Sequence, residues 1–254
     1  MYLAHYALCV QPRAIYNALM CGRYVSPDEA AIEREWHLGR TNNTPFRTRF
    51  NTSPTTRVPM LLADQEGGLE LQLARWGLIP HWWKDSKPPR LTFNARSEEA
   101  ASKPMWRYPA SRARCLIPAL GWYEWQEIER VNTATGEIEK IKQPHFIHLP
   151  NNQPFAFAGL VSEWRPEGQE VLLTCAILTQ DASGPAAEVH TRMPVVLPQD
   201  SQRDWLDATL IDAKQAIAQA RERAVTEFEH FAVRTRVNNA RNEGAELIER
   251  EVAP

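Results

Sequence analysis

The stretch Met20-Cys21-Gly22-Arg23-Tyr24 holds groups that could react together. A cysteine at the start of a chain carries two nucleophiles, an α-amine with a pKa of about 7.7 to 8.0 and a thiol with a pKa of about 8.5. A lysine amine, with a pKa of about 10.4, is neutral roughly 300-fold less often, so a terminal amine is the better group to attack an aldehyde. The thiol can then close on the imine to form a thiazolidine. Cys21 becomes such a residue once Met20 is removed.

The neighbours of Cys21 suit this chemistry, but a second interpretation is open. Gly22 lets the backbone come close to a substrate, and Arg23 is placed to meet a phosphate. The alternative is that Cys21 is an ordinary buried cysteine in a first strand. This stretch alone does not decide between the two.

A carboxylate lies among aromatic residues in Gly121-Trp122-Tyr123-Glu124-Trp125. On an alternating strand Glu124 shares a face with Trp122, and apolar surroundings raise the pKa of a carboxyl group by desolvation. Such a carboxyl group suits a general acid or base. The alternative is a glutamate at the rim of the fold, paired with an arginine.

His190 follows a turn or helix expected over residues 181–189 and comes just before a strand. Histidine titrates near pH 6.5 and can move protons at neutral pH, although a lone histidine is more often structural. His145 and His148 point to opposite faces of a strand, so we expect no shared metal ion and no chemistry from them. Asn51 and Asn94 are turn formers or hold a substrate through their amides. The spacing of these residues in the sequence does not decide between the two interpretations.

Residues 84–114 are rich in basic side chains, eight against three acidic ones, although the net charge of the chain is -2. The basic residues are Lys84, Lys87, Arg90, Arg96, Lys103, Arg107, Arg112 and Arg114, the acidic ones Asp85, Glu98 and Glu99, and the aromatic ones in or beside the stretch Trp82, Trp83, Trp106 and Tyr108. One interpretation is a solvent-exposed face that binds no partner. The other is a surface for single-stranded nucleic acid, which needs charge for its backbone and rings for base stacking.

The composition favours one large domain. A chain of 254 residues with 43% hydrophobic residues can bury a full core, and no linker divides it. Four cysteines occur without a CxxC pair or a secretory signal, so we expect neither disulfides nor a zinc site, and a cytoplasmic location. No stretch reaches about 18 apolar residues, so we expect no membrane span.

Many short strands and few helices, without regular βα alternation, predict an α+β domain built on antiparallel sheet. We expect helices over 26–37, 97–103, 200–208 and 213–223, with Ser26 capping the first and Pro104 ending the second. We expect strands over 57–63 and 69–76, joined as a hairpin, and over 115–117, 121–126, 145–148, 155–160 and 171–178, with a break near Pro118. The charged residues 127–142 are interpreted as a protruding hairpin or a mobile insertion.

Taken together these stretches resemble the SOS response-associated peptidase (SRAP) family, whose members form DNA–protein cross-links at abasic sites. The matching stretches are MCGRY at 20–24, FNTSP at 50–54, RWGLIP at 75–80, NARSE at 94–98, CLIPALGWYEW at 115–125, LTQDASG at 178–184, HTRMP at 190–194 and VNNARNEGAELIE at 237–249. No single stretch is decisive, but eight in the family's order are highly specific.

The resemblance implies a mechanism. The abasic site in single-stranded DNA opens to an aldehyde, the Cys21 amine forms a Schiff base with it, and the thiol closes a thiazolidine. By the same resemblance Glu124 handles protons, His190 assists sugar ring opening, imine chemistry and reversal, and Asn51 orients the terminal cysteine. These four residues would also carry the self-processing that exposes Cys21.

The resemblance also implies DNA contacts and a fold. The DNA contacts carried over are Arg23, Trp76, Asn94, Arg96, Trp125 and Thr179, with Lys103 added from the basic stretch. The family's fold is α+β, with a mainly antiparallel, partly closed barrel-like sheet and peripheral helices. No metal ion or organic cofactor is implied, and we expect a monomer that acts on DNA in the cytoplasm, associated with the nucleoid when bound.

One departure from the family concerns the N-terminus. Family members usually begin at the methionine before the cysteine, whereas 19 residues precede Met20 here. A cysteine inside a chain has no free amine, so either translation starts at Met20, or the chain is cut before Cys21, or this copy is inactive. We favour the first, with residues 1–19 as a leader and 20–254 as one SRAP domain.

Two further functions stay open. One is a peptidase that acts on other proteins, with Cys21 as nucleophile beside His190 and Glu124. The other is a module that binds single-stranded DNA without a covalent bond, through the basic and aromatic stretch.

Overall fold

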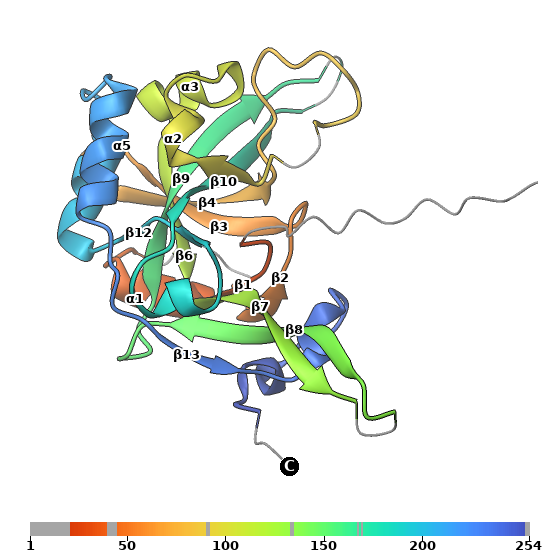
Figure 1. Cartoon of the computed structure of the whole chain (residues 1–254). Helices are drawn as coiled ribbons and strands as arrows, with labels where there is room; N and C mark the ends of the chain where they lie inside the picture. The colour runs from red at the N-terminus through yellow and green to blue at the C-terminus, as the bar shows by residue number, and fades with distance from the viewer. Residues whose placement is uncertain are drawn as a thin grey trace, which may run out of the picture.

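The computed structural model describes residues 21–39, 45–89, 92–132, 135–166, 168 and 170–251 (Figure 1). The expected leader at residues 1–19 lies outside the described residues, as does Arg90 of the basic stretch. The structure therefore leaves the prediction of a leader untested.

Five strands close into a small barrel at the centre of Figure 1. They are β3 (Arg57–Ala63), β4 (Leu69–Trp76), β6 (Arg114–Ala119), β9 (Phe155–Trp164) and β10 (Leu172–Asp181). Their order is β10-β4-β3-β6-β9, and the antiparallel pairing of β9 with β10 closes the ring. Within the ring the pairing of β4 with β10 is parallel, whereas the others are antiparallel. The short strands β5 (Asn94–Arg96), β11 (Arg192–Pro194) and β12 (Val196–Leu197) extend it.

A second, antiparallel sheet lies below the barrel in Figure 1, in the order β13-β8-β7-β1-β2. Its strands are β1 (Tyr24–Ser26), β2 (Arg49–Thr52), β7 (Gly121–Val131), β8 (Ile138–His148) and β13 (Glu229–Ala232). Only Leu120 separates β6 from β7, so the chain passes directly from the barrel into the second sheet. The expected α+β fold with a mainly antiparallel, partly closed barrel-like sheet is confirmed.

Helices and short helical turns surround the sheets, with α5 along one side of the barrel in Figure 1. They are α1 (Glu29–Glu35), α2 (Ser97–Ala100), α3 (Pro104–Arg112), α4 (Gln202–Leu206), α5 (Ala213–Glu222), η1 (Gly184–Glu188), η2 (Gln199–Ser201), η3 (Thr235–Asn238) and η4 (Ala245–Ile248). No helix in the described part of the chain has the length and apolar character needed to cross a membrane.

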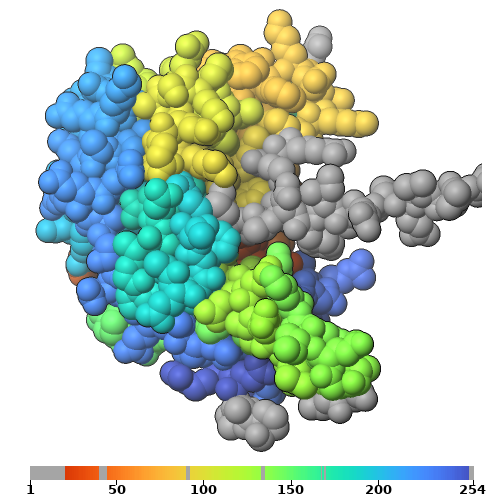
Figure 2. Space-filling view, in the orientation of Figure 1, coloured from red at the N-terminus to blue at the C-terminus, as the bar shows by residue number. Residues whose placement is uncertain are grey.

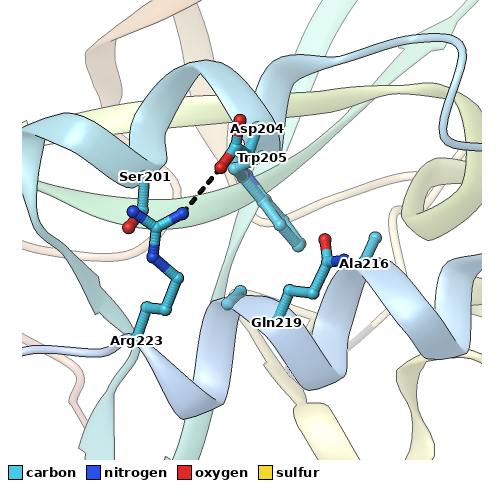
Figure 3. A pocket seen from close by; sticks show the side chains of 7 residues that line it. Ser201, Asp204, Trp205, Ala216, Gln219 and Arg223 are labelled. Carbon is cyan, nitrogen blue, oxygen red and sulfur yellow. Dashed lines mark hydrogen bonds and ion pairs between the residues drawn. The ribbon is translucent and has the colours of Figure 1, made fainter.

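Helices α4 and α5 border a small pocket on the side of the barrel (Figure 3). Arg223 lines it, with Nη1 placed 2.6 Å from Oδ2 of Asp204. None of the residues that the sequence predicts for catalysis or DNA binding lines this pocket. It therefore belongs to the packing of the two helices.

Three local predictions differ from the structure. The first helix is capped by Asp28, whose Oδ1 accepts from the Ala31 nitrogen at 2.7 Å, because Ser26 still pairs with β2 as the last residue of β1. Pro104 begins helix α3 and does not end α2, since a proline without an N–H is tolerated in a first helical turn. Strand β6 runs through Pro118, and the break falls at Leu120.

Residues 127–142 form the outer part of the β7–β8 hairpin. The two strands pair without a shift from Trp122↔Ile147 to Val131↔Ile138. The tip is exposed, with 57% of Val131 and 68% of Ile138 open to solvent. Of the two interpretations the protruding hairpin is confirmed.

The junction between the sheets generates a stability prediction at Gly121. A Cβ added there would lie 2.6 Å from the carbonyl oxygen of Ile147 and also overlap the ring of Phe146. We expect Gly121→Ala to lower the free energy of unfolding by about 2 kcal/mol, as overpacking of a dense interior does, measured by urea denaturation. Gly39→Ala is the control, since its Cβ would meet nothing within 4 Å. Equal losses in both variants would contradict the prediction.

Candidate active site

The main-chain nitrogen of Cys21 donates a hydrogen bond of 2.7 Å to Oε1 of Glu124, across 103 residues of sequence. Strand β1 begins three residues after Cys21 and pairs with β7 at Tyr24↔Trp122 and Val25↔Gly121. This register brings the residues before β1 alongside Glu124. The pairing of the two strands therefore delivers the cysteine to the carboxyl group.

Burial controls the protonation of this pair. Glu124 is 1% exposed and Cys21 3% exposed, and Cys21 belongs to the main hydrophobic core. Burial raises the pKa of Glu124 to about 8, and the hydrogen bonds that it receives from Cys21 oppose the rise. Burial, followed by the nearby Glu124 charge, raises the pKa of the Cys21 thiol well above its usual value. The expected burial of Glu124 is confirmed, and near neutral pH both groups are held mainly in their neutral forms.

His190 follows η1 and precedes β11, the position that the sequence predicts. Its Nδ1 lies 3.1 Å from the Arg192 nitrogen and 3.3 Å from the Arg192 carbonyl oxygen, which fixes the orientation of the ring. Burial lowers the pKa of His190, so the imidazole is neutral at pH 7. Among the hydrogen bonds of the described residues, none joins His190 to Cys21 or Glu124.

Asn51, which the resemblance places against the cysteine, makes its bonds elsewhere. Its Oδ1 accepts from Nη1 of Arg23 at 2.8 Å. Its Nδ2 donates to the carbonyl oxygens of Asn239 and Asn242 at 3.0 and 2.9 Å, with a longer contact of 3.3 Å to that of Val237. In the described part of the chain Asn51 therefore holds Arg23 and the C-terminal segment, and no hydrogen bond links it to Cys21.

The residues predicted to contact DNA divide by exposure. Arg96 and Lys103 are exposed, Arg23, Asn94 and Trp125 are half-buried, and Trp76 and Thr179 are fully buried. The Trp76 ring packs edge-on against Tyr24 and Phe93, with centroids 5.2 and 5.7 Å apart. The packing gives the two buried residues a structural role, and a direct contact with DNA stays a prediction for all seven.

The side chains of the basic stretch also differ in burial. Arg114 is buried and donates to the carbonyl oxygens of Ala110, Trp205 and Asp207, so it joins α3 to α4. Lys103 pairs with Glu99 at 2.6 Å, within an exposed turn.

The aromatic side chains of this stretch divide in the same way. Trp106 is buried, while Trp82 and Tyr108 are 46% and 52% exposed. The segment after β4, the residues around η1 and the β7–β8 hairpin all reach the face shown in Figure 2. Part of the stretch is therefore core and part is open surface.

His145 and His148 do not meet each other. Nδ1 of His145 lies 3.2 Å from Nδ1 of His230, and Nδ1 of His148 lies 2.8 Å from the carbonyl oxygen of Leu149. Within the described residues no group of three His, Cys, Asp or Glu side chains is arranged to hold a metal ion.

Comparison with known proteins places the chain in a family. The model of the SOS response associated peptidase (SRAP) family matches residues 20–240. This chain is an SRAP protein. It is 33% identical over 233 residues to abasic site processing protein YoqW of Bacillus subtilis, covering 91% of this chain and 99% of that protein. It is 35% identical over 207 residues to abasic site processing protein YedK of Escherichia coli, covering 79% and 84% of the two chains.

Solved structures share the fold. A protein from Bacteroides thetaiotaomicron superposes with a TM-score of 0.73 at 20% identity, covering 91% of this chain and all of that one. A phage-related protein from Bordetella bronchiseptica gives a TM-score of 0.57 at 29% identity, covering 84% and 94% of the two chains. The barrel with its second sheet is thus a fold that solved proteins share.

Arg192 is a residue of this SRAP site that sequence reasoning passed over. Its charge lowers the pKa of the Cys21 thiol, against the larger effect of burial. Its guanidinium contacts both carboxylate oxygens of Glu98 at 3.1 and 3.0 Å and Oδ1 of Asp181 at 2.5 Å. The signal was present, since Arg192 lies in the HTRMP stretch two residues after His190.

The raised pKa of Glu124 predicts a stability gain from its neutral analogue. A carboxyl group with a folded-state pKa of about 8 and an ordinary value of 4.5 favours folding fully below pH 4.5, and this contribution is lost as the pH rises through 8. Glutamine is uncharged at every pH, as the protonated carboxyl group is. We expect Glu124→Gln to raise the melting temperature by about 5 °C at pH 8.5 and by much less at pH 5.

Glu127→Gln on the same strand is the matched control, because Glu127 is exposed and, within the described part of the chain, its side chain pairs only with Lys140 at the surface. Calorimetry of the full chain at both pH values measures the difference. A gain for Glu124→Gln that is equal at pH 5 and pH 8.5 would contradict the assigned pKa.

Proposed function

We propose that this protein cross-links itself to abasic sites in single-stranded DNA through a thiazolidine at Cys21. The observation that carries the proposal is the 2.7 Å hydrogen bond between the Cys21 nitrogen and the buried carboxyl group of Glu124. It puts a group able to give and take protons on the atom that attacks the aldehyde. The names of the relatives, abasic site processing proteins, support the same lesion as target.

Each step balances with the groups at hand. The amine lone pair attacks the aldehyde carbon and forms a carbinolamine. Glu124, held protonated by burial, gives its proton to the departing hydroxyl, which leaves as water and yields the imine. The imine nitrogen formed in this way still carries its hydrogen. The carboxylate then takes the thiol proton while sulfur attacks the imine carbon and the C=N electron pair returns to the nitrogen. The net products are a thiazolidine and one water molecule.

His190 has a separate role in this proposal. An abasic sugar is mostly a closed ring, and its opening requires a proton to leave the anomeric hydroxyl. A neutral imidazole can accept that proton, and burial keeps the imidazole of His190 neutral. We assign it to ring opening and reversal. Asn51 supports the site through Arg23, which it holds at 2.8 Å.

Reaction requires a free amine on Cys21. In the chain as written Cys21 has a φ of 45°, in the left-handed region that costs a residue with a side chain about 1 kcal/mol or more. Removal of the preceding residues abolishes this dihedral angle and its cost. The strain supports exposure of the cysteine, by self-processing or by a start at Met20, as part of the function.

The peptidase that acts on other proteins has less support. A cysteine nucleophile works as its thiolate, whereas burial and the neighbouring Glu124 raise the thiol pKa of Cys21. A module that only binds DNA has no use for a buried carboxyl group on the Cys21 nitrogen. Both alternatives therefore leave the Cys21–Glu124 pair unexplained.

The first functional prediction concerns the adduct. We expect protein that begins at Cys21 to form a heat-stable adduct with an abasic single-stranded oligonucleotide, and Cys21→Ala to form none that survives heating. Denaturing gel electrophoresis and intact mass measure it, with a loss of one water. Cys21→Ser, which keeps the amine and its contact with Glu124, should give an adduct that is reversible and trapped only by borohydride. An adduct from Cys21→Ala equal to wild type would overturn the proposal.

The second concerns pH. The amine must be neutral, with an ordinary pKa of about 7.7 to 8.0, and Glu124, with a pKa of about 8, must be protonated. We expect the rate of adduct formation at saturating DNA to rise and then fall, with a maximum near pH 8. Glu124→Gln should lower the rate about 100-fold, as loss of a general acid does, and remove the alkaline decline. An unchanged decline in that variant would show that another group causes it.

A further inference from the structure

We infer that Asn238 is a positioning residue that aims Trp125 and Arg23 at the DNA strand. The inference rests on the proposed function, because it takes these two residues as DNA contacts. It deepens that function by assigning a task to the C-terminal segment, which the sequence analysis identified only as a matching motif.

Residues 235–242 tie together three strands of the second sheet. Arg23 precedes β1, Asn51 lies in β2 and Trp125 lies in β7, and each donates hydrogen bonds to this segment. Val237 anchors the segment, since it is fully buried against the cluster around Tyr123. Residues 235–242 thus connect three segments of the second sheet that carry predicted site residues.

Arg23 is held by neutral groups. Its Nη1 donates to Oδ1 of Asn51 and to the carbonyl oxygen of Val237, both at 2.8 Å, and its Nη2 reaches the carbonyl oxygen of Asn238 at 3.4 Å. No carboxylate within the described residues forms an ion pair with it. A guanidinium has five N–H donors, so two remain, together with an uncompensated positive charge. Such a group is arranged in advance for a phosphate.

Trp125 is held by the side chain of the same residue. Its indole Nε1 donates to Oδ1 of Asn238 at 2.7 Å. The ring is half-buried and packs against the hydrophobic cluster that contains Tyr123 and Val237. A base stacks best on a ring that is already oriented, since less rotational freedom is lost on binding. Asn238 therefore fixes Trp125 through its side chain while its main chain borders Arg23.

The test is Asn238→Ala in protein that begins at Cys21. Asn238 is exposed, so the variant keeps Val237 buried and should fold. We expect affinity for an intact single-stranded oligonucleotide, which has no abasic site, to fall about fivefold, the loss expected for one hydrogen bond. The rate of adduct formation at saturating abasic DNA should stay within about twofold. Fluorescence anisotropy and gel assays measure the two quantities.

A double-mutant cycle separates positioning from a general structural effect. Trp125→Phe keeps a stacking ring but removes the Nε1 donor. If Asn238 acts through Trp125, the double variant binds no more weakly than the weaker single variant. Fully additive losses would overturn the inference, and so would wild-type affinity in Asn238→Ala.

The matched control is Asn151→Ala, since among the described residues the Asn151 side chain bonds only Gln153, in an exposed turn after β8. It should bind DNA as wild type does. An equal loss of affinity in this control would overturn the assignment to Asn238. Failure of every variant and of wild type to form an adduct would refute the proposed chemistry, yet the affinity cycle would still decide the role of Asn238.

Discussion

The site depends on one buried hydrogen bond, between the nitrogen of Cys21 and the carboxyl group of Glu124. Neither partner is in a favourable place for its charged form, because both are almost completely buried. The pairing of β1 with β7 holds them there, and the single residue between β6 and β7 fixes that pairing to the barrel. The barrel thus acts on the chemistry indirectly, by withholding water from a carboxyl group and raising its pKa to about 8.

This arrangement lowers the free energy of unfolding, but it keeps a proton on the carboxyl group. A carboxyl group that titrates normally would be ionised at neutral pH and could not give a proton to a departing hydroxyl. Burying Glu124 beside Cys21 keeps the proton on the carboxyl group, at the expense of folding free energy above the ordinary pKa. The strained φ of Cys21 adds a smaller cost of the same kind. Both costs fall on residues to which the proposed mechanism assigns a role.

Sequence reasoning predicted what local patterns determine. The hairpin over Arg57–Ala63 and Leu69–Trp76 has the predicted bounds, because alternation and a Gly-Gly turn define it. The burial of Glu124 follows from its place between aromatic neighbours. What local patterns did not show depends on partners distant in sequence. The contacts of Asn51 with residues 237–242 need both ends of the chain folded together. The cap at Asp28 depends on Ser26 being claimed by a strand, which the cap signal alone could not show.

The surroundings of Glu124 and of Arg23 have opposite effects on the charge of these two side chains. Around Glu124, burial suppresses a charge, so that the group can exchange protons near neutral pH. Around Arg23, carbonyl and amide oxygens satisfy the donors without neutralising the charge, so that it stays available to an anion. The two halves of the site are adjacent in the chain, because Cys21 and Arg23 lie two residues apart, just before β1. A DNA strand bound at Arg23 would therefore meet the Cys21 nitrogen within two residues of its phosphate contact, and binding and reaction share one short segment of backbone.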